Sequence, residues 1–207
     1  MKKLLALLLA AVMLLALSAC GNKAEEQPSP TDGTPEEVLS VAETFLEAYY
    51  LRDYATKFSM YLYDARKQWE DAAIKDLGSA KEFFALAQKQ AEEKGIDVTV
   101  DSFDSYYAAY HRFILADCES IYGAYTVTTT ATASVKMSAD LLPQFRDNLL
   151  AGPSKDYMDA AVLNSINEVY TVTVNIVIDG EKKDYNENYL VYVVRYNNQW
   201  LVADHSA

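Results

Sequence analysis

The sequence predicts an α+β fold, in which N-terminal helices pack on a curved antiparallel sheet and a helical insertion separates the first two long strands. The hydrophobic pattern supports this prediction in two parts of the chain, one helical and one strand-forming. Apolar residues recur at helical spacing up to about residue 118, whereas apolar and polar residues alternate from Tyr125 onward. Short turn signals then separate the last strands, as in an antiparallel meander.

The first helix is expected to span about residues 35–50. Thr34 can cap it, Pro35 suits its first position, and Glu37 completes a capping box. One face of this helix carries its apolar residues: Val38, Val41, Ala42, Phe45, Leu46 and Tyr49.

Three further helices are expected before the sheet. Asp53 is predicted to cap the second, a single helix whose apolar stripe reaches Trp69. The third starts at the capping box Ser79–Glu82 and ends at Gly95, and the fourth spans about residues 102–118.

The first predicted strand runs from Tyr125 to Met137, with apolar residues on one face and hydroxyl side chains on the other. The remaining segments are short helices at 139–151 and 154–164, followed by strands at 170–178, 189–196 and 199–204. Asp179-Gly180 and Asn197-Asn198 are predicted to form tight turns, because both pairs tolerate the positive φ that such turns need.

The capped helix Thr34–Tyr50, the following Arg52-Asp53-Tyr54 and the terminal hairpin Tyr189–Asp204 resemble the NTF2-like superfamily. Trp200 with the apolar residues after it strengthens the resemblance, which covers residues 35–207. It implies a cone-shaped α+β domain. In enzymes of this superfamily, acids and histidines that project into the cone serve as general bases. The longer helical part and the insertion depart from the usual pattern.

The first residues are predicted to be an export signal. Lys2 and Lys3 precede the apolar run Leu4–Leu17. As a helix this run extends about 21 Å, less than the roughly 30 Å hydrocarbon core of a membrane. A basic start, a short apolar run and small residues behind it are typical of a secretory signal.

The segment Leu17-Ser18-Ala19-Cys20 resembles the lipobox of bacterial lipoproteins. This resemblance implies cleavage before Cys20 and attachment of a diacylglyceryl lipid to its sulfur. The expected organisation is a signal peptide at 1–19, a lipid-anchored flexible linker at 20–34 and the α+β domain at 35–207. The protein would then sit on the outer face of the bacterial cytoplasmic membrane. The alternative is an ordinary signal peptide or an uncleaved anchor.

Composition and motifs exclude several classes of function. The chain has 18 Lys and Arg against 30 Asp and Glu, a net charge of −12 that argues against a nucleic-acid partner. The sequence contains no GxGxxG, GxxxxGK, GxSxG or HExxH motif. We therefore expect no cofactor and no metal, and we assign no catalytic residue.

The sixteen tyrosines are the unusual feature of the composition. A tyrosine joins apolar area to a hydrogen-bonding tip, which suits sugars, peptides and protein surfaces. Tyr107 and Tyr110 are therefore candidate ligand-binding residues, with core packing as the alternative. Arg195 is a candidate anion-binding residue, and the alternative is an exposed position beside the following turn.

Other titratable residues receive structural interpretations. Cys118 is interpreted as a small buried residue, because His111 lies two helical turns away and cannot activate it. His205 is interpreted as part of a solvated chain end. Asp104 is expected to support a helix start rather than to bind a cation.

The leading hypothesis is a noncatalytic binding or interaction lipoprotein with a small-molecule, glycan or protein partner at the cell surface. One alternative is a small NTF2-like enzyme, a lyase, isomerase or hydrolase that uses an acid or histidine in the pocket. Another is an accessory solute-binding component of a transporter, although such proteins usually need a longer chain.

Overall fold

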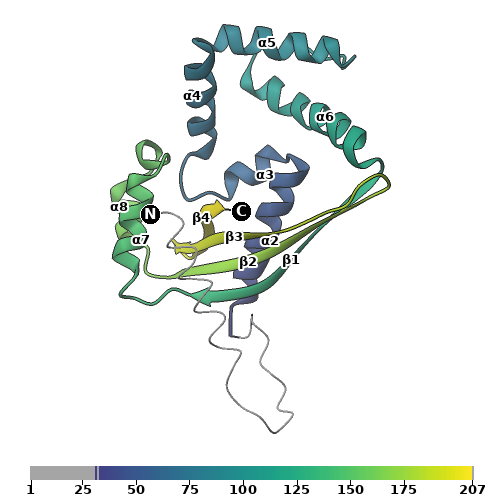
Figure 1. The fold of residues 1–207 in the computed structure, drawn as a ribbon. Helices are drawn as coiled ribbons and strands as arrows, with labels where there is room; N and C mark the ends of the chain where they lie inside the picture. Colours follow the sequence, from purple (N-terminus) through teal and green to yellow (C-terminus); the bar gives the residue numbers. More distant parts are fainter. Residues whose placement is uncertain (1–30, 32, 207) are drawn as a thin grey trace.

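Helices come first in the chain, and a four-stranded antiparallel sheet follows them (Figure 1). The computed structural model describes residue 31 and residues 33–206. Over this range the α+β prediction is confirmed, as is the helical insertion between the first two strands. The signal segment 1–19, Cys20 and most of the 20–34 linker lie outside the described residues.

Most helices of the described chain precede the first strand, and the other helical segments lie between the first and second strands. The helices are α2 (Glu36–Leu51), α3 (Tyr54–Ser59), α4 (Ala65–Leu77), α5 (Ala80–Glu93), α6 (Phe103–Tyr122), α7 (Leu142–Ala151), the 3-10 turn η1 (Lys155–Tyr157) and α8 (Ala160–Ser165). The strands are β1 (Tyr125–Lys136), β2 (Val169–Gly180), β3 (Tyr185–Tyr196) and β4 (Gln199–Ser206), and they neighbour one another in sequence order.

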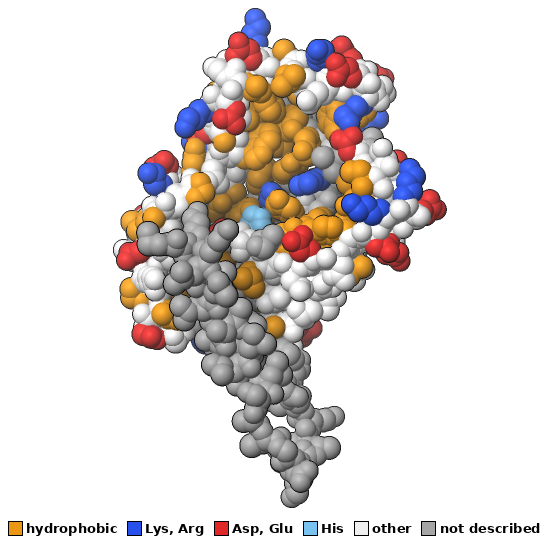
Figure 2. Space-filling view, viewed as in Figure 1, with side chains coloured by type: hydrophobic (Ala, Val, Ile, Leu, Met, Phe, Trp, Pro, Cys, Tyr) orange, Lys and Arg blue, Asp and Glu red, His pale blue; other side chains and the backbone are white. Residues whose placement is uncertain are grey.

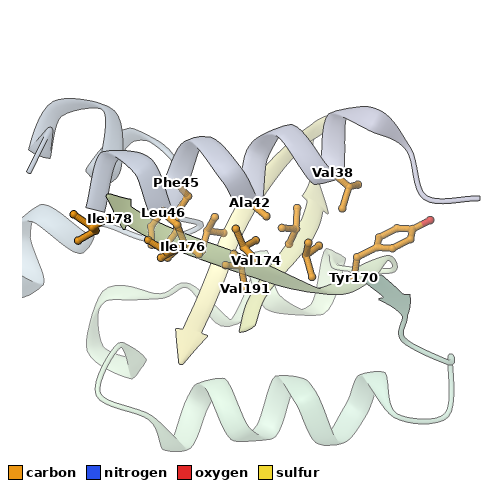
Figure 3. Close-up of a cluster of buried hydrophobic side chains, with 12 residues drawn as sticks. Val38, Ala42, Phe45, Leu46, Tyr170, Val174, Ile176, Ile178 and Val191 are labelled. Atoms are coloured by element: carbon orange, nitrogen blue, oxygen red, sulfur yellow. The ribbon is translucent and has the colours of Figure 1, made fainter. Parts of the chain in front are cut away.

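Helix α2 covers one face of the sheet (Figure 3). Its residues Ala42, Phe45 and Leu46 are fully buried against Val174 and Val191 of the central strands. Burying a side chain of this kind stabilises the fold by roughly 1.5–3 kcal/mol. The contact between α2 and the sheet is therefore the main core of the domain.

The inserted helices cover part of the opposite face. Successive side chains of a strand point to opposite faces, so Val169 and Val194 lie on the side away from α2. There they pack with Phe145 of α7 and Leu163 of α8 in a second buried cluster. The sheet is thus covered by helices on both sides at this end.

Helices α4, α5 and α6 form a third unit, which we call the arch. In Figure 1 it stands off from the sheet and packs mainly against itself. The prediction that the N-terminal helices pack on the sheet therefore holds for α2 and is wrong for the arch. The buried residues of the arch include Phe83, Ala87 and Tyr106.

Several predicted helix ends are confirmed. Asp53 caps α3 by accepting a hydrogen bond from the Thr56 N–H (3.1 Å), and Ser79 caps α5. Ser102 caps α6, and Gly95 follows the end of α5 with a φ of +67°. Helix α6 runs four residues beyond the predicted end, to Tyr122.

The capping box predicted at Thr34 is wrong. Helix α2 has no side-chain cap, because the Thr34 hydroxyl instead forms a hydrogen bond with the Ser134 hydroxyl on β1. The pattern of residues could not distinguish a local cap from this contact with a distant strand.

The single helix predicted after Asp53 is also wrong, because residues 60–62 join the edge of the sheet. The Leu62 N–H donates to the Val202 carbonyl and the Val202 N–H donates to the Met60 carbonyl, each at 2.8 Å. These bonds interrupt the helix, and Asp64 then caps α4.

The two predicted turns have different outcomes. Asn197 and Asn198 form the expected tight turn, with φ values of 49° and 61°. Strand β2 continues through Gly180, however, so the turn predicted there lies later, at residues 181–184. A Cβ atom at Gly180 would lie 2.6 Å from the Lys183 carbonyl oxygen, so close packing explains this glycine.

Candidate binding site

A hollow lined by apolar side chains lies between the arch and the rest of the molecule (Figure 2). Six aromatic residues from α3, α4 and α6 contact one another, and we call them the aromatic cluster. They are Tyr54, Phe58, Trp69, Tyr106, Tyr107 and Tyr110. Tyr54 and Tyr106 are buried, and the other four keep part of their surface exposed.

Tyr54 is the centre of the aromatic cluster. Its ring centroid lies 5.2 Å from those of Tyr107 and Tyr110 and 5.3 Å from that of Phe58. Tilted ring pairs at such distances contribute about 0.5–1.5 kcal/mol each beyond their buried area. Burial raises the pKa of Tyr54 above its ordinary value, so its hydroxyl stays neutral.

A cavity of about 390 Å³ adjoins the cluster at the junction of α2 and α3. It is lined by Leu51, Arg52, Asp53, Tyr54, Ala55, Tyr107 and Ala108. It is an open depression rather than an enclosed space, and its volume is comparable with that of the smaller small-molecule pockets, roughly 300–1,000 Å³. Two rings of the aromatic cluster are thus also walls of a cavity.

Two cations lie at this junction. The Lys57 Nζ atom lies 4.4 Å from the centroid of the Tyr49 ring, and the Arg52 Cζ atom lies 5.3 Å from it. Burial and the nearby Arg52 charge lower the pKa of Lys57 to about 8. Neither cation forms an ion pair with any carboxylate in the part of the chain that the structure describes.

Arg52 has an unfavourable backbone conformation. It ends α2 with a φ of 60° and a ψ of 30°, the left-handed region that glycine adopts most easily. A non-glycine residue there costs about 1–2 kcal/mol of conformational energy.

His205 lies in an aromatic environment and not at a solvated chain end, so that interpretation is wrong. It pairs with Val191 within the sheet, and its ring centroid lies 5.1 Å from that of Phe45 and 5.2 Å from that of Tyr49. Its Nδ1 atom lies 3.3 Å from the Tyr61 hydroxyl oxygen. Burial, with a smaller effect of the Lys57 charge, lowers the pKa of His205 to about 4.

This pKa limits the chemistry that His205 can perform. A general base is most effective when its pKa lies near the working pH. His205 is neutral at pH 7 but holds a proton too weakly to abstract one efficiently. Its neighbour Asp204 keeps an exposed surface, although desolvation raises the pKa of the Asp204 carboxyl.

The structure brings together two of the three predicted ligand-binding residues. Tyr107 and Tyr110 both contact Tyr54 in the aromatic cluster. Arg195 is exposed on β3, where its guanidinium lies 3.6 Å from Glu168 and above the ring of Trp200. Arg195 thus has partners of its own and is not part of the hollow.

Sequence reasoning missed Arg52 and Lys57 as site residues, and it considered His205 but interpreted it as part of a solvated chain end. The segment Arg52-Asp53-Tyr54 was noted as part of the resemblance to the NTF2-like superfamily. Nothing in these three residues indicates that Arg52 adopts the left-handed backbone conformation. The position of His205 within β4 could have been predicted by extending the alternation of the last strand beyond residue 204. Lys57 carries no local signal, because its environment comes from α2 and β4.

The other titratable residues have ordinary surroundings. Cys118 is half-buried and forms no disulfide, and the side chain of His111 lies outside the described residues. Asp104, in the first turn of α6, accepts a hydrogen bond from Arg66 (2.7 Å). Among the described residues, no group of three or more His, Cys, Asp or Glu is arranged to hold a metal. Within that same part of the chain, no helix is long and apolar enough to cross a membrane.

Comparisons with known proteins identify no family. No family model and no solved structure matches the chain. A stretch of 69 residues is 35% identical to hydroxyethylthiazole kinase from Photobacterium profundum, which is 32% of this chain and 25% of the kinase. The chain thus spans about a quarter of the length of this curated relative. A local similarity of this size carries neither fold nor activity to this chain.

Proposed function

We propose that this protein is a noncatalytic binding module whose ligand lies in the aromatic hollow. The observation that carries this proposal is the position of Tyr54 and Tyr107, which belong to the aromatic cluster and also line the cavity. Tyr107 keeps part of its surface exposed, whereas Phe45 in the main core is fully buried. Partly exposed tyrosines beside a cavity of this size fit a small molecule or a glycan best.

We also propose that the module is a lipoprotein. Its organisation would be a signal peptide at 1–19, a linker at 20–34 that begins with lipidated Cys20, and an NTF2-like domain at 35–207. The support is the basic start, the short apolar run and the lipobox. Two or more acyl chains provide stable membrane attachment, whereas one chain does not. The proposed location is the outer face of the bacterial cytoplasmic membrane.

The NTF2-like assignment is supported by α2, which lies along the sheet, and by bulges in two strand pairs. The register shifts between Ala131 and Ala133 and between Tyr192 and Val193. Such bulges bend strands and increase their twist, as a cone requires. The arch and the inserted helices would then be additions to that domain.

A small NTF2-like enzyme is the second candidate, because His205 lies among aromatic rings beside Lys57. The low pKa of His205 favours the binding module. An activity that His205→Asn abolishes while ligand affinity is kept would reverse this order.

The lipid anchor is tested by labelling cells that express the full chain with radioactive palmitate. We expect label on the wild-type protein in the membrane fraction. Cys20→Ala should carry no label and leave that fraction. An unlabelled wild-type protein would refute the lipoprotein proposal.

The binding function is tested by native mass spectrometry of the full chain purified from its own membranes. We expect a retained small molecule that Tyr107→Ala loses. Tyr196→Ala is the matched control, because Tyr196 is a half-buried tyrosine on β3 outside the aromatic cluster. Retention that is unchanged in Tyr107→Ala, or no retained molecule at all, would contradict the proposal.

A further inference from the structure

The two cations at the α2–α3 junction contact aromatic rings but no described carboxylate. Arg52 and Lys57 share the ring of Tyr49, at 5.3 Å and 4.4 Å from its centroid. Acidic residues outnumber basic ones by 30 to 18 in this chain, so carboxylate partners are plentiful. Among the described residues, however, neither of these cations forms an ion pair with one.

The environment makes these charges unfavourable to each other. Both side chains are half-buried, and like charges repel more strongly where water is excluded. Asp53 also lines the cavity, but its carboxylate accepts the Thr56 N–H at the start of α3. Aromatic rings face the two positive charges, but no carboxylate among the described residues lies within ion-pair distance of them.

The arginine also carries an unused donor. Its Nε atom is buried and has no hydrogen-bond partner among the described atoms. An unmade hydrogen bond of a buried charged group is costly, so most such groups in native proteins are paired. Arg52 further occupies a left-handed backbone position that glycine would adopt without strain. Arg52 thus carries two unfavourable features, an unpaired buried donor and a strained backbone conformation.

We infer that Arg52 and Lys57 bind the oxyanion of a small organic ligand, a phosphate monoester or a carboxylate, whose ring packs on the tyrosines of the hollow. This inference rests on the proposed binding function and adds the chemical class of the ligand. The planar guanidinium suits two oxygens of one anion, and the ammonium of lysine adds a point charge. Tyr54 and Tyr107 line the same cavity as Arg52 and supply the apolar walls.

The test measures ligand affinity by isothermal titration calorimetry, with the full chain in neutral detergent micelles at pH 7. The probes are phenyl phosphate, benzoate, inorganic phosphate and phenol. Phenyl phosphate and benzoate carry both an anion and a ring, whereas the other two carry one part each. We expect each two-part probe to bind at least tenfold more tightly than phenol or inorganic phosphate. The ratio of phenyl phosphate to benzoate affinity shows which oxyanion the site prefers.

Two substitutions separate binding from folding. Arg52→Gly removes the guanidinium and relieves the left-handed strain, and Lys57→Met removes the charge but keeps most of the stem. Both should weaken phenyl phosphate binding at least tenfold while the melting temperature stays equal or rises. Lys81→Met is the matched control, because Lys81 is exposed on α5. It should bind as the wild type does.

Three outcomes would overturn the inference. They are equal affinity for phenol and phenyl phosphate, unchanged affinity in both variants, and no binding of either two-part probe. If one of these outcomes occurs but native mass spectrometry shows a retained neutral molecule, the proposed binding function is kept. Only the preference of the site for anions is then refuted. Failure of both experiments would refute the proposed function itself.

Discussion

The sheet layer and the arch bury apolar residues in different ways. Against the sheet, α2 buries aliphatic and aromatic side chains completely, with Phe45 and Val174 at 0% exposure. In the arch, the large side chains are mostly aromatic, and Trp69 and Tyr107 remain half-buried. Complete burial maximises the hydrophobic contribution to stability, whereas exposed ring faces can contact other molecules. The sheet layer thus holds most of the fully buried side chains, whereas the arch keeps part of its ring surface exposed.

The arch contacts the rest of the molecule through the aromatic cluster, in which Tyr54 of α3 meets Tyr107 and Tyr110. The Lys182 Nζ atom also donates to the Glu119 and Ser120 carbonyls of α6. Residues 60–62 link α3 to β4, and Gly123 separates α6 from β1. The Tyr157 hydroxyl donates to Asp71 (3.0 Å) and so ties the inserted helices to α4. We expect the arch to open without unfolding of the sheet.

The largest expected effect comes from truncation in the sheet layer. Phe45→Ala should lower the free energy of unfolding by about 3–5 kcal/mol, because it leaves a cavity in a fully buried site. Urea denaturation followed by circular dichroism measures the change. Leu86→Ala, at a residue of the arch that is 44% exposed, should change stability by less than about 0.5 kcal/mol. Similar losses in the two variants would contradict the comparison.

Truncation in the arch should act locally. Trp69→Ala removes ring contacts with Phe83 and Tyr106 and should destabilise the arch by about 2–4 kcal/mol. Hydrogen exchange measured by mass spectrometry should show faster exchange in α5 and α6, with unchanged exchange in β2. Equal acceleration in β2 would mean that the two regions unfold as one unit.

His205 should make the sheet layer sensitive to acid. Its pKa is about 4 in the folded chain against an ordinary value of 6.5, so the unfolded chain binds the additional proton between these values. Stability therefore falls as the pH falls through this window, by about 2–3 kcal/mol at pH 4. His205→Gln should lack this component. Parallel stability profiles of the two proteins from pH 7 to 4 would contradict the expectation.

Lys57→Met should stabilise the protein by about 1–2 kcal/mol at pH 7, after allowance for solvent screening of a half-buried charge. The pKa of Lys57 is about 8 when folded against an ordinary 10.5, so its charged form opposes folding below pH 8. Wild-type stability should rise between pH 8 and 10.5, and the advantage of the variant should shrink there. Thermal melts of both proteins at pH 7 and 10 measure this, with Lys81→Met as the control. An advantage that is absent at pH 7 would contradict it.

The sheet layer was largely predictable from the sequence, whereas the site was not. Period-2 alternation identified β1 and β2 because one face of each strand is less exposed than the other, and Asn197-Asn198 identified a turn because positive φ needs particular residues. The break at residues 60–62 depends on pairing with Val202, a contact between distant parts of the chain that no local pattern contains. The aromatic residues Tyr107 and Tyr110 were visible by type. The cations beside them depend on burial, which only the assembled fold supplies.

The helical insertion has a consequence for the order of folding. The loop between β2 and β3 contains residues 181–184, whereas the connection between β1 and β2 spans residues 137–168. Closing the longer connection costs about 2 kcal/mol more in chain entropy, if entropy grows with the logarithm of length. The hairpins of β2, β3 and β4 should therefore form early, with β1 joining them later. An edge strand that arrives late leaves the backbone groups of β2 unpaired for longer, so this step is where self-association during refolding would begin.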